Sequence, residues 1–342
     1  RQFGTSSTGY AFSVSSDSQG NVYVAGFTRG TLPQQSSGGG SDAFVRKYDS
    51  SGNESWTRQF GGSSEDIARA VAADSQGNVY VVGYTAGNLP GQTSVGAGDA
   101  FVRQYDSSGN VSWTRQFGTS SYDDARGVAV DNTSSVYVAG YTVGTLPSQT
   151  SSGNEDAFLC KYDSSGNVSW IRQFGTSAAD CAYGVAVDAT GNPHIAGHTR
   201  GALPGQTSSS GQDGFVRKYD SLGGDVWTSQ FGGGGSIDIG MDVAVDSQGN
   251  AYIVGYTEGT LPGQTSSGMD DAFVRKYDSS GNVLWTRQFG TSDLDSAYSV
   301  ATDNAGNVYV AGLTLGAFAG QYSSGQQDAF LRKYDSSGNV SW

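Results

Sequence analysis

The chain repeats itself about every 57 residues, and this period limits the fold more than any other feature of the sequence. The triplet Gln-Phe-Gly starts at six positions: Gln2, Gln59, Gln116, Gln173, Gln230 and Gln288. A second motif, Asp-Ala-Phe or Asp-Gly-Phe, follows the same spacing from Asp42 to Asp328. A fixed period of this kind is typical of repeat architectures, in which each copy is one structural unit. The 342 residues therefore form six copies.

Each copy contains four segments with strand character. In the third copy they are residues 126–131, 135–142, 156–163 and 167–175, rich in β-branched and aromatic residues. The first pair and the second pair are joined by Asp-x-x-Gly-Asn turns or close variants, in which Asp caps the turn and Gly accepts a left-handed backbone. Four antiparallel strands per copy predict a propeller blade. The predicted fold is all-β: a six-bladed β-propeller with four antiparallel strands per blade.

Three recurring segments carry a resemblance to a known family. "GVAVD", "GNVYVAGYT" and then "DAFVRKYDSSGNVSWTRQFG" recur, with variations, through all six copies. The chain resembles the bacterial β-propeller repeat called the SBBP repeat. The resemblance implies a propeller fold in a secreted or surface-anchored bacterial protein, often a large and modular one. The localisation that it implies is extracellular or at the cell surface.

The expected organisation is one propeller domain over residues 1–342. The fourth strands are expected to end at six glycines: Gly4, Gly61, Gly118, Gly175, Gly232 and Gly290. Residues 339–342 begin a fourth strand, and residues 1–4 carry the sequence that ends one. Two interpretations stay open. Residues 339–342 and 1–4 together close a ring, which removes an open sheet edge, or the chain is one unit of a longer tandem array.

Composition narrows the class of partner. The formal net charge is −13, with 19 basic and 32 acidic residues. Sequence-independent nucleic-acid binding needs a basic surface, so no nucleic-acid partner is expected. No stretch approaches the roughly 18 consecutive apolar residues of a membrane span, so none is predicted.

Five of the six copies place an aspartate just before the first strand, which lines the channel of a propeller. These residues are Asp66, Asp123, Asp180, Asp238 and Asp295, and the first copy has Gly9 instead. Carboxylates beside backbone oxygens are ligands for calcium, so one hypothesis is an incomplete ring that binds this ion. The alternative is that each aspartate caps its own loop. No other cofactor is predicted.

The long loops between the second and third strands are the candidate binding face, because loops on a rigid scaffold usually carry function. Each of five such loops has a leucine followed by proline: Leu32, Leu89, Leu146, Leu203 and Leu261. Their near-identity suits a repetitive partner. The expected partners are polysaccharide, other surface proteins or further copies of this chain.

Several residues of other types are also candidates for modification or metal binding. Five asparagines lie in Asn-x-Ser/Thr sequences, where either glycosylation or turn chemistry explains them: Asn53, Asn110, Asn132, Asn167 and Asn339. Cys160 and Cys181 form no Cys-x-x-Cys pair, and a disulfide between them is left open. His194 and His198 replace tyrosines of other copies, and four residues along a strand is roughly 13 Å, too far for one metal.

The sequence contains no recognisable nucleophile and base arrangement, since its serines lie mainly in turns. The predicted function is a non-catalytic extracellular scaffold or adhesion module, a building block of a surface protein or fibre, and not an enzyme. One alternative is a polysaccharide-binding or carbohydrate-active propeller with a site at the channel mouth. Another is a metal-stabilised interaction domain.

Overall fold

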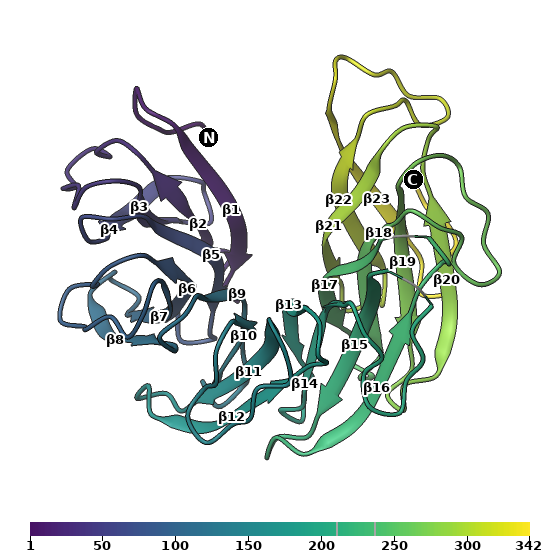
Figure 1. Ribbon diagram of the computed structural model, residues 1–342. Coiled ribbons are helices and arrows are strands. Elements are labelled where there is room, and N and C mark those ends of the chain that lie inside the picture. Colours follow the sequence, from purple (N-terminus) through teal and green to yellow (C-terminus); the bar gives the residue numbers. More distant parts are fainter. Residues whose placement is uncertain (210, 236) are drawn as a thin grey trace. The chain divides into compact units, whose positions relative to one another are not determined.

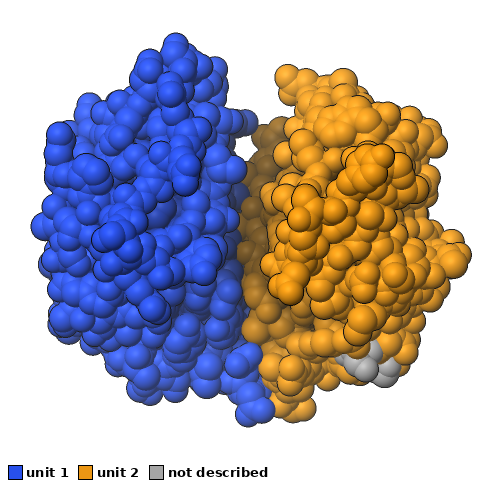
Figure 2. All heavy atoms as spheres, turned by 90° about the horizontal axis from the view of Figure 1, so that it is seen from above, with its two compact units in different colours: residues 1–174 blue, residues 175–342 orange. Residues whose placement is uncertain are grey.

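The chain folds into antiparallel β-sheets (Figure 1). The computed structural model describes residues 1–209, 211–235 and 237–342, and every regular element in those ranges is a strand. In the same ranges, nothing has both the helical form and the apolar length needed to cross a membrane. The chain divides into two compact units, Arg1–Phe174 and Gly175–Trp342, coloured separately in Figure 2. Each unit contains three sheets, which are the blades of a propeller.

The first unit holds blades 1 to 3, each with four strands in sequence order. Blade 1 consists of β1 (Gly9–Ser16), β2 (Val22–Thr28), β3 (Asp42–Tyr48) and β4 (Glu54–Phe60). Blade 2 consists of β5 (Asp66–Ala73), β6 (Val79–Thr85), β7 (Asp99–Tyr105) and β8 (Val111–Phe117). Blade 3 consists of β9 (Asp123–Val130), β10 (Val136–Thr142), β11 (Asp156–Tyr162) and β12 (Val168–Phe174).

The second unit holds blades 4 to 6. Blade 4 consists of β13 (Asp180–Val187), β14 (Pro193–Thr199), β15 (Asp213–Tyr219) and β16 (Asp225–Phe231). Blade 5 consists of β17 (Asp238–Val245), β18 (Ala251–Thr257), β19 (Asp271–Tyr277) and β20 (Val283–Phe289). Blade 6 consists of β21 (Asp295–Thr302), β22 (Val308–Thr314) and β23 (Asp328–Tyr334). A single bridge between Tyr334 and Val340 marks where its fourth strand begins.

The all-β, six-bladed propeller predicted from the repeat is confirmed. Its turns form as the sequence predicts: Asp17 Oδ1 accepts hydrogen bonds from the backbone nitrogens of Gln19 and Asn21. Gly20 in the same turn has a φ of +79°, in the left-handed region that glycine tolerates best. The domain boundaries and the closure of a ring by residues 339–342 and 1–4 stay predictions.

One element differs from the sequence analysis. The first strand of the third copy was expected at residue 126 but begins at Asp123. The backbone nitrogen of Asp123 donates to the carbonyl of Gly98 in the preceding blade at 2.9 Å. The first residues of β9, Asp123 to Ala125, pair with β10 of the same blade, and the register shifts next to Arg126. This bulge interrupts the alternation of the strand, so the sequence pattern does not show that the strand begins before residue 126.

The core lies between facing blades. One cluster of buried side chains joins Tyr23 and Trp56 of blade 1 to Phe101 and Tyr105 of blade 2. Large aromatic rings fill this space, as they must where two sheets face each other at about 10 Å. The aromatic residues of the repeat are therefore packing residues that join one blade to the next.

Candidate functional site

Within each unit the tryptophan of a fourth strand bonds to the next blade, and in blades 1, 2 and 5 an arginine does so as well. In blade 2, Trp113 Nε1 donates to the carbonyl of Ser164 at 3.1 Å, and Arg115 Nε donates to the carbonyl of Gly166 at 2.8 Å. Both acceptors lie in the last turn of blade 3. The Trp-to-Ser bond recurs within the units for Trp56 with Ser107, Trp227 with Ser279 and Trp285 with Ser336. The acceptors are backbone carbonyl oxygens, so the contact depends on the conformation of the turn and not on its side chains.

A glutamine on the same strand bonds inside its own blade. Gln288 Nε2 donates to the carbonyl of Gly259 and to Asp271 Oδ2, each at 2.8 Å. Its Oε1 accepts from the backbone nitrogen of Leu261 at 2.9 Å, and its own backbone nitrogen donates to Gln264 Oε1 at 3.0 Å. We call this set of four partners the glutamine site. The sites of the other four-stranded blades hold Gln59, Gln116, Gln173 and Gln230.

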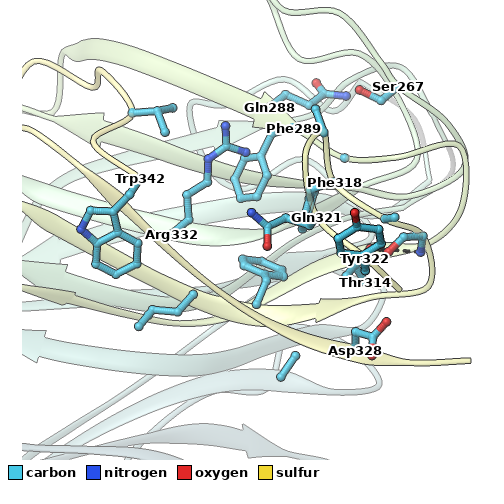
Figure 3. A pocket seen from close by; sticks show the side chains of 18 residues that line it. Ser267, Gln288, Phe289, Thr314, Phe318, Gln321, Tyr322, Asp328, Arg332 and Trp342 are labelled. Atoms are coloured by element: carbon cyan, nitrogen blue, oxygen red, sulfur yellow. Dashed lines mark hydrogen bonds between the residues drawn. The ribbon is translucent and has the colours of Figure 1, made fainter. Parts of the chain in front are cut away.

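Blade 6 has the four groups of the glutamine site, but in the described part of the chain no glutamine from a fourth strand of this blade lies among them. The equivalent groups are Gly316, Phe318, Gln321 and Asp328, and all four line a cavity of about 740 Å³ (Figure 3). Phe289 of blade 5 and Trp342 complete its wall. On this side β23 pairs with residues 340–342, through the bridge from Tyr334 to Val340 and through backbone hydrogen bonds of Lys333 with Ser341 and Trp342. Its Leu331 is 58 % exposed, whereas Val274 at the same position of blade 5 is fully buried.

Residues 1–3 lie on blade 1 in the way that a strand end lies on the next blade. Arg1 Nε donates to the carbonyl of Gly52 at 2.7 Å, and Phe3 meets Phe44 edge-on with ring centroids 5.5 Å apart. The corresponding contacts between blades 1 and 2 are Arg58 to Gly109 at 2.7 Å and Phe60 to Phe101 at 5.6 Å. Gln2 is exposed, and residues 1–8 belong to no strand.

The aspartates predicted as a calcium ring each begin a first strand instead of preceding it. All five are fully buried: Asp66, Asp123, Asp180, Asp238 and Asp295. Each accepts from a backbone nitrogen of its own linking loop, as Asp66 Oδ2 does from Gly62 at 2.7 Å. These bonds are the loop capping that the alternative predicts.

At the junction of blades 1 and 2 a second carboxylate lies near the first. A Cβ atom on Gly61 would stand 2.5 Å from Asp42 Oδ1 and 2.6 Å from Asp66 Oδ2, so the two oxygens approach one point. Burial raises the pKa of Asp66 to about 6, and the charge of Asp42 adds to the rise. In residues 1–209, 211–235 and 237–342, no three His, Cys, Asp or Glu side chains are grouped to hold a metal. Calcium binding stays a prediction.

The leucines of the candidate binding face are not on the surface. Leu32, Leu89, Leu146, Leu203 and Leu261 are each at most 1 % exposed. Their buried side chains anchor the loop, and their backbone nitrogens donate to the glutamine of the same blade. The exposed apolar residues of these loops are others, such as Val95 at 55 % and Met269 at 62 %. Binding by this face stays a prediction.

All five asparagines of the Asn-x-Ser/Thr sequences are exposed: Asn53, Asn110, Asn132, Asn167 and Asn339. In four of them the side-chain nitrogen donates to the aspartate that opens the same turn. Turn chemistry therefore explains those four asparagines. Glycosylation at any of the five stays a prediction.

The irregular residues of blades 3 and 4 are buried. Cys160 and Cys181 are thiols in the structure. His194 and His198 are 0 % and 5 % exposed, and neither ring nitrogen of His194 has a hydrogen-bond partner. Burial lowers the pKa of each histidine to about 4, with Lys218 adding for His194 and Arg200 for His198. Both imidazoles are therefore neutral near pH 7.

A charged cluster breaks the repeat in the first unit, and the sequence analysis missed it. Arg69 of β5 and Arg126 of β9 both contact Asp124 Oδ2, at 3.2 and 2.8 Å. The aspartate is fully buried, while the arginine side chains keep 21 % and 28 % exposure. Three tyrosines stack beside them: Tyr84, Tyr122 and Tyr141. The available signal was that Asp124 stands where blade 2 has Ile67.

Family comparison supports the resemblance seen in the repeats. Four segments match the model of the beta-propeller repeat SBBP: residues 55–90, 112–146, 226–261 and 284–319. The regulatory protein FlaEY of Caulobacter vibrioides is 27 % identical over 90 % of this chain and 36 % of its own length. A WD repeat-containing protein, L264, of Acanthamoeba polyphaga mimivirus is 24 % identical over 96 % of this chain and 31 % of its own. The chain thus spans about a third of these relatives.

Solved structures share the fold at low identity. A polysaccharide lyase of family PL25, an ulvan lyase bound to a glucuronate and sulfated rhamnose disaccharide unit, has a TM-score of 0.53 at 11 % identity, covering 99 % of this chain and 86 % of its own. The beta-propeller domain of the Trilobed protease from Pyrococcus furiosus has a TM-score of 0.51 at 9 % identity, covering 98 % and 83 %. At such identities the likeness shows the propeller fold alone.

Proposed function

We propose that this chain of SBBP-type propeller repeats is a non-catalytic scaffold or adhesion module that works outside the cell. It would serve as a building block of a surface protein or fibre. The observation that carries the proposal is the use of the repeated polar residues. The tryptophan, arginine and glutamine of the fourth strand and the turn aspartates all bond to the framework of the blades.

Polar residues that bond to the framework of the blades favour a structural role over a catalytic one. A catalytic acid or base needs to reach a substrate proton within about 3 Å. The recurring carboxylates instead accept hydrogen bonds from their own loops, as Asp66 and Asp123 do. Nearest-neighbour contacts between equal repeats are the usual basis of an extended protein whose stability grows with each unit.

The test is incubation of the chain with neutral, uronate-containing and sulfated polysaccharides. New reducing ends and new unsaturated uronate absorbance are measured together with binding by affinity electrophoresis. We expect no cleavage of any polymer. Sustained cleavage that is lost when a cavity or cluster residue is substituted would contradict a non-catalytic role.

The cluster of Arg69, Asp124 and Arg126 favours a second candidate function, the binding of an acidic polysaccharide. Asp124 can neutralise only one of its two arginines, so the cluster keeps one positive charge. Guanidinium groups bind carboxylate and sulfate through paired hydrogen bonds, and tyrosine rings offer flat surfaces to sugars. The similar fold of a lyase bound to a sulfated, uronate-containing saccharide makes this polymer class a sensible probe.

Removing the charge tests this second candidate. Replacement of both arginines by glutamine should abolish retention in a gel that contains a polyuronate. The matched control is Arg172→Gln, which removes a partly buried arginine of β12 outside the cluster. Equal retention of wild-type and doubly substituted protein would eliminate the cluster as the site.

A further inference from the structure

We propose that Arg69 and Arg126 bind one acid group, a carboxylate or a sulfate, of a single sugar residue between their guanidinium groups. This inference rests on the second candidate function, the binding of an acidic polysaccharide, and names the unit of the polymer that is recognised. Both arginines stand at the one position of the first strand where the copies of the repeat differ most.

Every first strand has a β-bulge at this position. The register shifts around one residue that has no partner on the second strand, as between Ala68 and Ala70 of β5 and beside Arg126 of β9. A bulge takes one side chain out of the alternation of the strand and often re-aims it beside a functional site. The six bulge residues are Phe12, Arg69, Arg126, Tyr183, Met241 and Tyr298.

The bulge residue varies within a segment that is otherwise nearly constant. Each copy has alanine or glycine immediately before the bulge residue and valine two positions after it, as in residues 68–71. The bulge residue itself is phenylalanine, arginine, tyrosine or methionine. In blades 2 to 5 the residue before the bulge is buried, whereas the bulge residue is partly exposed. A position that accepts four residue types and stays partly exposed serves the surface of the blade more than its core.

In the first unit one carboxylate brings two bulge residues together. The strands β5 and β9 lie side by side (Figure 1). Arg69 and Arg126 contact the same oxygen of Asp124, at 3.2 and 2.8 Å, so their guanidinium groups are close enough to share one further acid group. Asp124 is fully buried and contacts them from inside, while the exposed part of each arginine is what a ligand can reach.

Tyrosine hydroxyls stand beside the guanidinium groups. Arg126 Nη2 lies 3.4 Å from the hydroxyl of Tyr141. Tyr122 stacks with Tyr84 and with Tyr141, at centroid distances of 4.7 and 6.0 Å, which fixes the three rings. Guanidinium groups bind carboxylate and sulfate through paired hydrogen bonds, and a tyrosine hydroxyl both donates and accepts. The cluster therefore offers partners for the acid group and for the hydroxyls of one sugar residue.

The charge of the whole chain favours recognition by direct contact. Two arginines and one aspartate leave the cluster with one positive charge, in a chain whose formal net charge is −13. A chain with this balance repels a polyanion at long range. Binding of an acidic polymer then has to come from contacts at the cluster, where one acid group at a time can be held.

Titration with monosaccharides tests the inference. Glucuronic acid, its methyl ester, glucose 6-sulfate and glucose are added to the chain and followed by saturation-transfer NMR and calorimetry. We expect both charged sugars to bind, and the preferred one identifies the acid group. The ester and glucose should bind at least about tenfold more weakly, because they lose the hydrogen bonds between charged groups.

A triple variant with residues from other copies assigns the binding to the cluster. Arg69→Met, Asp124→Ile and Arg126→Tyr supply the residues that blades 5, 2 and 4 have at these positions. All three charges are removed together, so no buried charge loses its partner and the variant should fold, which circular dichroism verifies. Its binding of the charged sugars should fall to that of glucose. Arg172→Gln is the matched control and should bind like the wild type.

The outcomes separate this inference from the function on which it rests. Retention of the chain in a polyuronate gel without binding of either charged monosaccharide would overturn recognition of a single residue and leave the second candidate function in place. Equal binding of glucuronic acid and its ester would overturn the pairing of the arginines with an acid group. Absence of retention and of monosaccharide binding would remove the second candidate function as well. The non-catalytic role would stand in each case, because it is tested by polysaccharide cleavage.

Discussion

Blades 5 and 6 have nearly the same sequence on their third strands but very different surroundings. Val274 of β19 is fully buried, whereas Leu331 of β23 is 58 % exposed. Asp271 accepts a hydrogen bond from the glutamine of its own blade, whereas Asp328 lines a cavity. The difference shows that each copy of the repeat supplies one side of its contact with the preceding blade and one side of its contact with the following blade. A blade reaches its full burial only beside a fourth strand and a following blade.

The largest expected effect comes from the tryptophan that joins two blades. Trp56 is 9 % exposed and belongs to the core between blades 1 and 2, so Trp56→Ala should lower the free energy of unfolding by about 3–5 kcal/mol. Trp342, at the same repeat position, is 57 % exposed. Trp342→Ala should change that free energy by less than about 0.5 kcal/mol. Denaturant titration of both variants measures the contrast, and equal losses would break the comparison.

Blade 4 extends the comparison, since two histidines there replace tyrosines of other blades. The pKa values of His194 and His198 fall to about 4 on burial, while unfolded imidazole titrates near 6.5. Between pH 4 and about 6.5 the imidazoles bind protons in the unfolded chain but not in the folded chain. The free energy of unfolding should therefore drop as the pH falls from about 6.5 toward 4, by about 2–4 kcal/mol at pH 5 for both groups together.

The double variant His194→Tyr, His198→Tyr isolates this effect. It restores the residues of blade 3, Tyr137 and Tyr141, and contains no imidazole that titrates on unfolding. Carboxylates with raised pKa, such as Asp66, act in the opposite direction but are common to both proteins. The difference between the two stability curves should grow as the pH is lowered. Parallel curves would show that the imidazoles have the same pKa in the folded and the unfolded chain.

The glutamine site should give a smaller loss. Gln288→Ala leaves the backbone nitrogen of Leu261 and the carboxylate of Asp271 each without one partner, which should cost about 1–3 kcal/mol of unfolding free energy. Gln2→Ala removes an exposed side chain and should cost almost nothing. Thermal unfolding of both variants measures the contrast. A large loss for Gln2→Ala would show that this glutamine also makes buried hydrogen bonds.

The fold could be predicted from the sequence because the information is local and repeated six times. Turn aspartates, left-handed glycines and β-branched runs act within a few residues, as in the turn from Asp17 to Asn21. The start of β9 was misplaced because a bulge lies next to Arg126, and the residues before the bulge still pair with β10. A bulge interrupts the alternation by which a strand is recognised in a sequence.

The site was harder to predict for a related reason. The sequence marks Leu261 as a loop residue but does not show that its side chain is buried and that its nitrogen bonds to Gln288. The glutamine repeats as clearly as the tryptophan, yet its partners lie 17 to 29 residues away along the chain. The cluster around Asp124 departs from the repeat, so a search for regularity passes over it.

The smallest expected effect concerns calcium at the junction of blades 1 and 2. Oxygen atoms of Asp42 and Asp66 approach one point there. In the first copy Gly9 stands at the position that Asp66 has in the second copy. If a cation relieves the repulsion between the two carboxylates, millimolar calcium should raise the melting temperature by about 2 °C. Asp66→Asn removes one charge and should abolish most of that rise, and magnesium serves as the control ion. A melting temperature that calcium leaves unchanged would remove the ion from the account and leave loop capping as the role of the aspartates.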